Sequence, residues 1–462
     1  MLGNHFGPGN AVHWGRRPGR RYARKLGEGR KDQTLSTFTP DASAALEGPD
    51  WLRHRRAAAA EAFAGASLPT TEEEVWRYSR IDDLDLDDFS PAAGDGAGAG
   101  APAQVGVPDL LRPLLDAASG RAALIVARNG RLVQAELRDD LAAKGVRVGP
   151  IGEVDADALG SAIDQAPDVF LTFNDAFLAQ PVLVRVPAGV TVDGPVVVAH
   201  VTDGDGRAAF PRLVVDAGED SDVSVLEIQA SGPEPGLVVP VTEIVAGRAA
   251  RVGHVTVQQL GLATWQLGLQ VASVGAEASL RTTSIGFGGD YARFRTDCRM
   301  VGRGGTGELD AVYFGEGDQT LDFRTFQEHI APDCTSNLLF KGAVGGRSRS
   351  VYTGMIRVGK EARGTNAFQT NRNVKLSDGA WAESVPNLVI ENNDVRCSHA
   401  SAVGPIDEEQ RFYLESRGLP TDEAERLIVS GFFDEVLDRA PVASVASLLR
   451  STIAAKFERR EA

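Results

Sequence analysis

The chain has 462 residues, of which 43% are hydrophobic and 24% charged, and its formal net charge is −15. This composition is typical of a folded globular protein with a sizeable core, and the negative charge argues against nucleic acid as the main partner, since phosphate binding needs a basic surface. No run of 18 or more hydrophobic residues occurs, so the sequence predicts neither a membrane-spanning helix nor a membrane partner.

The first 31 residues contain eight lysines and arginines against one acidic residue, Glu28. No hydrophobic segment follows them, so they do not resemble a secretory signal. We interpret residues 1–45 as a disordered basic tail, and a functional basic arm is the alternative.

Residues 46–180 have the pattern of a helical and mixed α/β region. A Gly/Ala/Pro-rich linker over 90–106 divides it, and an Asn-Gly pair favours a hairpin turn between two short strands. The elements expected here are a helix over Trp51–Phe63, a capped helix start over Pro69–Glu74, a hairpin over 122–137 and a short helix within 153–180.

Residues 181–405 consist of short strand patterns separated by turn residues, with no helical periodicity between them. Turn residues recur at steps of 27 to 29: these are Gly218, Gly247, Gly275, Gly304, Pro332 and Gly359. Such a period is typical of a solenoid in which each coil packs on the next. The pattern therefore predicts a β-helix, and a β-sandwich is the alternative.

Residues 406–462 return to helical patterns. Asp407 is expected to begin a helix, with Gln410 completing a capping box, and Phe412 and Tyr413 on its hydrophobic side. Two further helices are expected, one capped by Thr421 with a stripe of Ile428, Phe432 and Val436, and one over Val442–Glu458. A simple end cap for the solenoid is one interpretation of this region.

Two glycine-rich strings match nucleotide-binding motifs only superficially. Residues 302–307 satisfy GxGxxG, but a strand pattern follows instead of a helix. Residues 354–360 satisfy GxxxxGK, but Glu361 stands where Ser or Thr must hold magnesium. We therefore expect no nucleotide site. A carbohydrate-active enzyme is also disfavoured, because only 6% of the residues are aromatic.

Cys397 and His399 lie two residues apart at the end of the last strand pattern, so their side chains should share one face. Thiolate and imidazole both bind iron and zinc, but two ligands do not complete a site. His329 and Cys334 are candidates for the missing ligands, and a simple buried thiol is the alternative. Three cysteines in 462 residues also indicate a reducing, cytoplasmic location.

The segment DVRCSHASAVGPIDEEQRFYLESRGLPTDEAERLIVSGFFDEVL resembles the C-terminal signature of the SufB/SufD family, the scaffold subunits of an iron–sulfur cluster assembly machine. The likeness continues through TNAFQTNRNVKLSDGAWAESVPNLVIENNDV and EHIAPDCTSNLLFKG, and TTEEEVWRYSRIDDLDL is similar to the family's N-terminal part. It covers most of the chain from about residue 48. Within the family the DVRCSH stretch resembles SufD more than SufB, although Ala400 stands where SufD often has glycine.

The resemblance implies a right-handed parallel β-helix that pairs with a SufB-like paralogue and docks a SufC-like ABC ATPase through C-terminal helices. It implies a non-catalytic scaffold and a transient iron–sulfur cluster shared with a partner subunit, with His399 at the position of the family's ligand histidine and Cys397 beside it. The residues expected to bind partners are Asp407, Phe412, Tyr413, Arg417, Gly418, Ile428, Phe432, Phe433 and Val436.

Two other functions remain open from the sequence. One is a purely structural adaptor without a cluster ligand, which would tolerate substitution of Cys397 and His399 but not of helix 421–437. The other is a SufB-like scaffold subunit, including one that forms a metal-binding homodimer without a paralogue.

Overall fold

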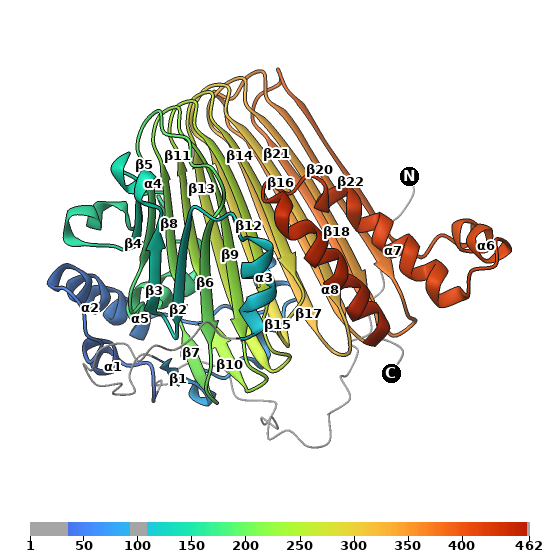
Figure 1. The fold of residues 1–462 in the computed structure, drawn as a ribbon, viewed down its shortest axis with the longest axis horizontal. Coiled ribbons are helices and arrows are strands. Elements are labelled where there is room, and N and C mark those ends of the chain that lie inside the picture. The colour runs from blue at the N-terminus through green and yellow to red at the C-terminus, as the bar shows by residue number, and fades with distance from the viewer. Residues whose placement is uncertain (1–35, 93–108, 460–462) are drawn as a thin grey trace, which may run out of the picture. The chain divides into compact units, whose positions relative to one another are not determined.

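The computed structural model describes residues 36–92 and 109–459, and its dominant feature is a stack of strands from two parallel sheets (Figure 1). Most of the predicted basic tail and of the predicted linker lies outside these residues. In the described part of the chain, no helix is long and apolar enough to cross a membrane.

The two sheets take alternate strands from the chain, as a β-helix requires. The path of the first sheet contains β4 (Arg147–Pro150), β5 (Val182–Val186), β8 (Arg212–Ala217), β11 (Val241–Ala246), β13 (Thr264–Val274), β15 (Tyr291–Met300), β17 (Thr320–His329), β19 (Arg349–Val358) and β21 (Trp381–Ile390). The second contains β3 (Arg131–Leu137), β2 (Ala123–Arg128), β6 (Val196–Thr202), β9 (Asp222–Ser231), β12 (Arg251–Gln259), β14 (Ser279–Gly286), β16 (Thr306–Gly315), β18 (Thr335–Val344), β20 (Asn366–Lys375) and β22 (Arg396–Pro405). Three short strands, β1 (Ser90–Pro91), β7 (Arg207–Ala209) and β10 (Gly236–Val238), pair beside the first sheet.

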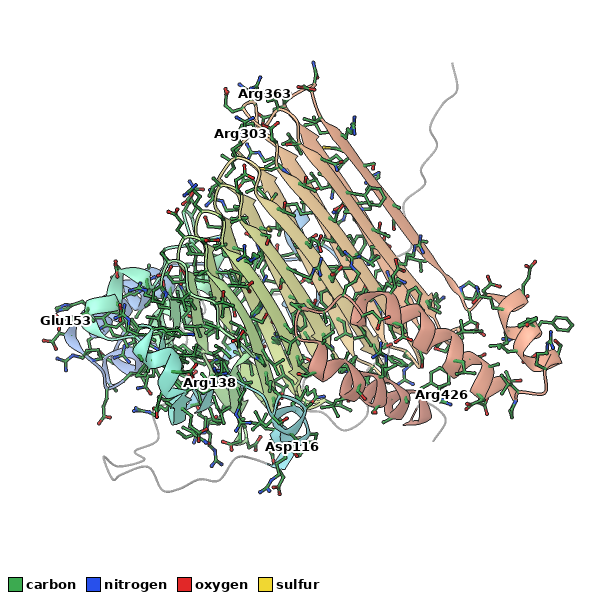
Figure 2. All side chains as sticks on the ribbon, turned by 45° about the horizontal axis from the view of Figure 1, so that its top comes forward. Asp116, Arg138, Glu153, Arg303, Arg363 and Arg426 are labelled. Atoms are coloured by element: carbon green, nitrogen blue, oxygen red, sulfur yellow. The ribbon has the colours of Figure 1, made fainter. Side chains whose placement is uncertain are left out.

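The β-helix prediction is confirmed, with about eight turns from β5 to β22. Each turn residue that marked the period lies where a strand of the first sheet leads into a strand of the second. A Cβ at Gly275 would lie 2.8 Å from the carbonyl oxygen of Ala246 in the preceding coil, so the coils approach too closely there for a side chain. Arg303 and Arg363 lie at this same corner, two coils apart (Figure 2).

The predicted hairpin is also confirmed, since β2 and β3 pair in antiparallel fashion around Asn129 and Gly130, whose φ angles are 50° and 76°. The hairpin is not a separate unit, because β2 pairs with β6 and so extends the second sheet. β4 extends the first sheet in the same way. Part of the region 46–180 therefore belongs to the sheets of the solenoid.

The helices formed by residues 40–44, 50–64 and 169–177 share a hydrophobic cluster with the outer face of the first sheet, whereas the helix at 112–117 belongs to a cluster with the second sheet. The helices of the N-terminal part are α1 (Pro40–Ala44), α2 (Asp50–Ala64), α3 (Arg112–Ala117), α4 (Asp139–Ala143) and α5 (Val169–Phe177), with 3-10 turns at Glu74–Trp76, Ile81–Asp83, Leu86–Asp88, Asp109–Leu111 and Glu153–Ala158. The helix predicted over Trp51–Phe63 is confirmed as α2.

Two N-terminal predictions were wrong. The disordered tail does not extend to residue 45, because α1 forms and Phe38, only 2% exposed, packs edge-on against Phe173. The helix start predicted over Pro69–Glu74 leads only into the 3-10 turn Glu74–Trp76, and no α-helix begins there. Arg293 and Arg324 donate hydrogen bonds to the carbonyl oxygens of Val75 and Arg77, and these bonds hold the segment across the strands.

In the described part of the chain, three helices follow the last strand, and the second and third of them pack on the outer face of the second sheet. They are α6 (Glu408–Ser416), α7 (Thr421–Leu437) and α8 (Ala446–Arg459), the last preceded by a 3-10 turn at Ala443–Val445. α7 contacts β16 and β18, while α6 projects beyond the last strand (Figure 1). Asp407 caps α6 as predicted, accepting hydrogen bonds from the backbone N–H groups of Glu409 and Gln410.

Two details of α7 differ from the prediction. Pro420 is the N-cap residue, because the Thr421 hydroxyl instead donates a 2.9 Å hydrogen bond to Glu415. The buried stripe contains Ala424, Val429, Phe433, Val436 and Leu437, so Ile428 and Phe432 lie at its half-buried margin.

Candidate functional site

The last coil of the solenoid has an open edge. Within residues 36–92 and 109–459, β22 has one sheet neighbour, β20, and β21 has one, β19. The N–H of Arg396 bonds to the carbonyl oxygen of Thr365 on the β20 side. Successive residues of a strand direct their N–H and C=O groups to opposite sides, so the odd-numbered residues of β22 direct theirs to the open edge.

The residues Cys397, His399 and Ser401 share the inner face of this coil. Cys397 packs against the hydrophobic cluster around Ile356 and Ala367, which fixes the inward direction. Two positions further along, the hydroxyl of Ser401 donates a 2.7 Å hydrogen bond to the hydroxyl of Ser384 on β21. His399 lies between Cys397 and Ser401 on the same face of β22. Its side chain is exposed because no further coil covers the last one.

The predicted pair Cys397 and His399 is therefore placed side by side at the mouth of the solenoid. Partial burial raises the pKa of the Cys397 thiol, so the thiol form is favoured until a cation approaches. Cys397 is half-buried and His399 is open to solvent. A ligand that enters at the open end can reach both side chains.

The structure does not bring His329 or Cys334 to this mouth. His329 is fully buried, its Nε2 lies 2.8 Å from the hydroxyl of Ser336, and burial lowers its pKa to about 4. The Cys334 thiol donates to the carbonyl oxygen of Gly302 in the corner of an earlier coil. In the described part of the chain, no group of three or more histidine, cysteine or acidic side chains is placed to hold a metal ion.

A polar layer lies directly behind the mouth, in the preceding coil. Asn371 and Asn373 bond to the hydroxyl of Tyr313, each at 2.9 Å, and Gln369 bonds to the hydroxyl of Tyr352 at 3.2 Å. Aromatic rings of both sheets pack against one another from this layer back into the lumen: they belong to Phe294, Tyr313, Phe323, Phe340 and Tyr352. The lumen behind the mouth is therefore lined by packed side chains.

A second exposed surface lies on α6 and α7. Phe412 is 71% exposed and Tyr413 is 57% exposed, so the hydrophobic side predicted for α6 faces solvent. A hollow of about 380 Å³ is lined by Glu409, Gln410, Tyr413, Leu414 and Ile428. The guanidinium of Arg417 lies 5.2 Å from the centre of the Tyr413 ring, and Gly418, with φ 92°, follows the helix end.

Three of the predicted partner-binding residues pack within the chain instead. Phe433 and Val436 are fully buried against the second sheet. The ammonium of Lys341 donates a 2.8 Å hydrogen bond to the carbonyl oxygen of Phe432 and lies 4.6 Å from the centre of its ring. Phe433 and Val436 therefore hold α7 on the solenoid, and half-buried Phe432 lies at the margin of this contact.

Sequence reasoning identified the pair at the mouth but missed three features around it. They are the open edge of β22, Ser384 and Gln369. Ser384 and Gln369 belong to other strands, so only the register reveals that they face the same lumen. Within β21, the sequence SVPNLV gives no indication that Ser384 faces the lumen beside the predicted pair.

The fold and the site together define a β-solenoid protein whose last coil is uncovered and carries an imidazole and a thiol. The family model described as "SUF system FeS cluster assembly, SufBD core domain" matches residues 200–432. The chain belongs to the SufBD family of iron–sulfur cluster assembly proteins, and the predicted resemblance is confirmed.

Individual relatives agree with this assignment. An iron–sulfur cluster assembly SufBD family protein of Mycobacterium tuberculosis is 37% identical over 304 residues, which cover 63% of this chain and 74% of the relative. SufD of Bacillus subtilis is 30% identical over 59% of this chain and 63% of its own length. SufD of Escherichia coli is 27% identical over 80% of this chain and 85% of its own length. These relatives support a SufD-like role.

Proposed function

We propose that this chain is a SufD-like scaffold subunit that builds an iron–sulfur cluster at the boundary with a SufB-like paralogue. One observation carries the proposal: the last coil is open, and its inner face presents His399 and Cys397. The geometry leaves the ligand set incomplete within the described residues. A second subunit can supply the remaining ligands.

The open edge of β22 is the best surface for the paralogue. Strand addition supplies backbone hydrogen bonds along an unpaired edge. The edge of β21 is interrupted by Pro386, which has no N–H and occupies an edge-facing position. β22 has no proline before its last residue, Pro405, so its edge offers a longer run of donors and acceptors. We therefore infer that pairing runs along β22.

The two side chains suit a site that must release its cargo. Imidazole nitrogen and thiolate sulfur both bind iron, and iron–sulfur clusters are usually held by several thiolates. A cluster held by His399 and Cys397 on one side and by a partner on the other would lose ligands when the subunits separate. The cluster is therefore transient and is the product of the assembly, not a resident cofactor.

The α6–α7 surface is the proposed docking site for a SufC-like ABC ATPase. Its exposed Phe412 and Tyr413, beside the hollow that Ile428 lines, match the aromatic and aliphatic anchors of protein interfaces. α7 continues from this surface onto β16 and β18. A movement of the bound ATPase would therefore reach the solenoid through α7.

The chain itself is proposed to bind no nucleotide and to catalyse no reaction. Residues 354–358 of its GxxxxGK string lie inside β19 instead of forming a phosphate-binding loop before a helix. The net charge of −15 disfavours nucleic acid. We also propose a cytoplasmic location, because three cysteines in 462 residues suit a reducing compartment.

The experiment that tests this function is co-expression of the chain with its SufB-like and SufC-like partners, followed by measurement of complex mass and of visible cluster absorbance. Replacing His399 by Ala should leave the complex mass unchanged and reduce cluster absorbance at least tenfold. Ser398→Ala is the matched control, because Ser398 lies on the opposite face of the same strand. Equal absorbance in the His399→Ala complex would leave only the adaptor function. A metal-loaded assembly of this chain alone would instead support the homodimer.

A further inference from the structure

Gln369 is the closest polar neighbour of His399 in the register of the last two coils. The two residues are paired in the ladder between β20 and β22, so their side chains project into the lumen side by side. Gln369 is 1% exposed, while His399 is exposed. Gln369 therefore forms part of the floor beneath the imidazole.

Only the oxygen end of the Gln369 amide has a hydrogen-bond partner among the described residues. Its Oε1 accepts a 3.2 Å hydrogen bond from the hydroxyl of Tyr352, which lies 3.1 Å from the hydroxyl of Thr325. A Cβ at Gly354 would lie closer than 3.0 Å to both Gln369 Oε1 and the Tyr352 hydroxyl. Glycine at position 354 thus makes room for this pair of side chains.

The other end of the amide has no hydrogen-bond partner among the described residues, although it is buried. A buried polar group without a partner costs about 1–3 kcal/mol. A half turn of the amide exchanges its oxygen and nitrogen. The nitrogen then donates to the Tyr352 hydroxyl, that hydroxyl donates to Thr325, and the amide oxygen becomes the buried end that lacks a partner among the described residues.

A neutral imidazole always carries one N–H that needs an acceptor. We propose that Gln369 is a positioning residue, whose amide oxygen accepts a hydrogen bond from Nδ1–H of His399 and so directs the Nε2 lone pair toward the open end. Histidines that bind metals usually donate their second ring N–H to such an acceptor, which fixes the tautomer and the ring orientation. The consequence for cluster binding rests on the proposed function, whereas the hydrogen bond itself does not.

The test is the tautomer of His399 in the isolated full chain, measured by NMR of the ring nitrogens after selective ¹⁵N-histidine labelling. The signals are assigned by their loss in His399→Ala. At a fixed alkaline pH, the wild-type ring should be mainly in the Nδ1–H form. Gln369→Leu should shift it to the Nε2–H form, and Gln369→Glu should restore Nδ1–H, because a carboxylate is also an acceptor.

Gln327→Leu is the matched control. Gln327 is another fully buried glutamine of the lumen, but it bonds to Ser336 and is paired with Ile356, away from the mouth. Its replacement should leave the His399 signals unchanged. An Nε2–H ring in the wild type, or an unchanged tautomer in Gln369→Leu, would overturn the proposal. Circular dichroism of each variant confirms that the chain remains folded.

The same variants separate this inference from the proposed function. In the co-expressed complex, Gln369→Leu should lower cluster absorbance severalfold, and Gln369→Glu should recover most of it. If His399→Ala assembles clusters normally while the tautomer still responds to Gln369, the ligand role fails and the positioning contact stands. If His399→Ala abolishes clusters and Gln369→Leu changes neither tautomer nor absorbance, only the positioning role fails.

Discussion

The hydroxyl of Ser401 donates a hydrogen bond to the hydroxyl of Ser384 at 2.7 Å and so joins the two strands of the last coil across the lumen. The backbone N–H of Ser401 points the other way, to the open edge of β22. One residue thus contributes both to the closure of its own coil and to the edge on which we propose that a partner pairs.

Ser401→Pro should prevent partner pairing without unfolding the chain. Proline is tolerated at an edge position because the lost N–H has no partner within the sheet. We expect at least a tenfold loss of SufB-like partner in co-purification, measured by size-exclusion chromatography with light scattering. Ser401→Ala, which removes only the hydroxyl, should retain the partner. Normal pairing of the proline variant would place the interface elsewhere.

Phe433 and Phe412 should respond in opposite ways to replacement by alanine. Phe433 is fully buried against the second sheet, so its loss should lower the free energy of unfolding by about 3–5 kcal/mol. Phe412 is 71% exposed, so its loss should change that energy by less than about 0.5 kcal/mol. Denaturant titration measures both values.

Phe412→Ala should nevertheless weaken binding of the SufC-like ATPase, measured by calorimetry, if the α6–α7 surface is its docking site. Exposed Leu262, which lies between β12 and β13, supplies the control, and Leu262→Ala should leave this affinity unchanged. An unaltered affinity in Phe412→Ala would exclude Phe412 from the docking surface.

His329 should make the protein less stable in acid. Burial lowers its pKa in the folded chain to about 4, below the ordinary value of 6.5. The unfolded chain therefore binds a proton that the folded chain resists, and stability falls as pH decreases from 6.5 to 4, by about 2–3 kcal/mol in total. His329→Gln should flatten the pH dependence of the unfolding free energy in this window. Exposed His54→Gln should not, and equal slopes in both variants would contradict the assignment.

Glu243→Ala should be among the most damaging single substitutions. Its carboxylate lies 2.7 Å from the guanidinium of Arg212, both side chains are fully buried, and it also accepts from the backbone N–H of Gly160. Removing one partner leaves a buried charge uncompensated, which costs about 3–5 kcal/mol. Thermal unfolding should show this loss, while Glu219→Ala, whose carboxylate pairs at the surface with Arg248, should change little.

Much of the solenoid could be predicted because each coil repeats the same physical requirement. Gly218, Gly247 and Gly275 recur because neighbouring backbones approach closely at these corners, so the period is visible in one sequence. The pairing of Cys397 with His399 on one face follows from strand alternation alone. The helix prediction after Pro69 was wrong because the backbone of this segment is held by Arg293 and Arg324, which lie more than 200 positions later in the chain. No local sequence pattern indicates that contact.

The site could be predicted only in part. Gln369 lies beside His399 because of the register in which β20 pairs with β22. That register is set by contacts along both strands, which are about 30 residues apart in the sequence, so it cannot be seen in a local pattern. The sequence predicted partner contacts for Phe412 and Tyr413 but not how exposed they are, because a hydrophobic residue on a short helix has the same pattern whether it packs or projects. Contact with the solenoid decides this, and α7 makes that contact while α6 does not.

The aromatic rings behind the mouth also bear on the path by which iron, sulfide and a cluster would enter and leave the last coil. Phe294 and Tyr313 of one coil pack against Phe323 of the next, so side chains fill the lumen between these coils. If the proposed function is correct, iron, sulfide and the finished cluster would therefore all pass through the open end of the last coil, which the proposed partner covers. Entry of iron and sulfide and release of the cluster would then be separate stages. The partner would have to be bound while the cluster forms and to dissociate before the cluster leaves.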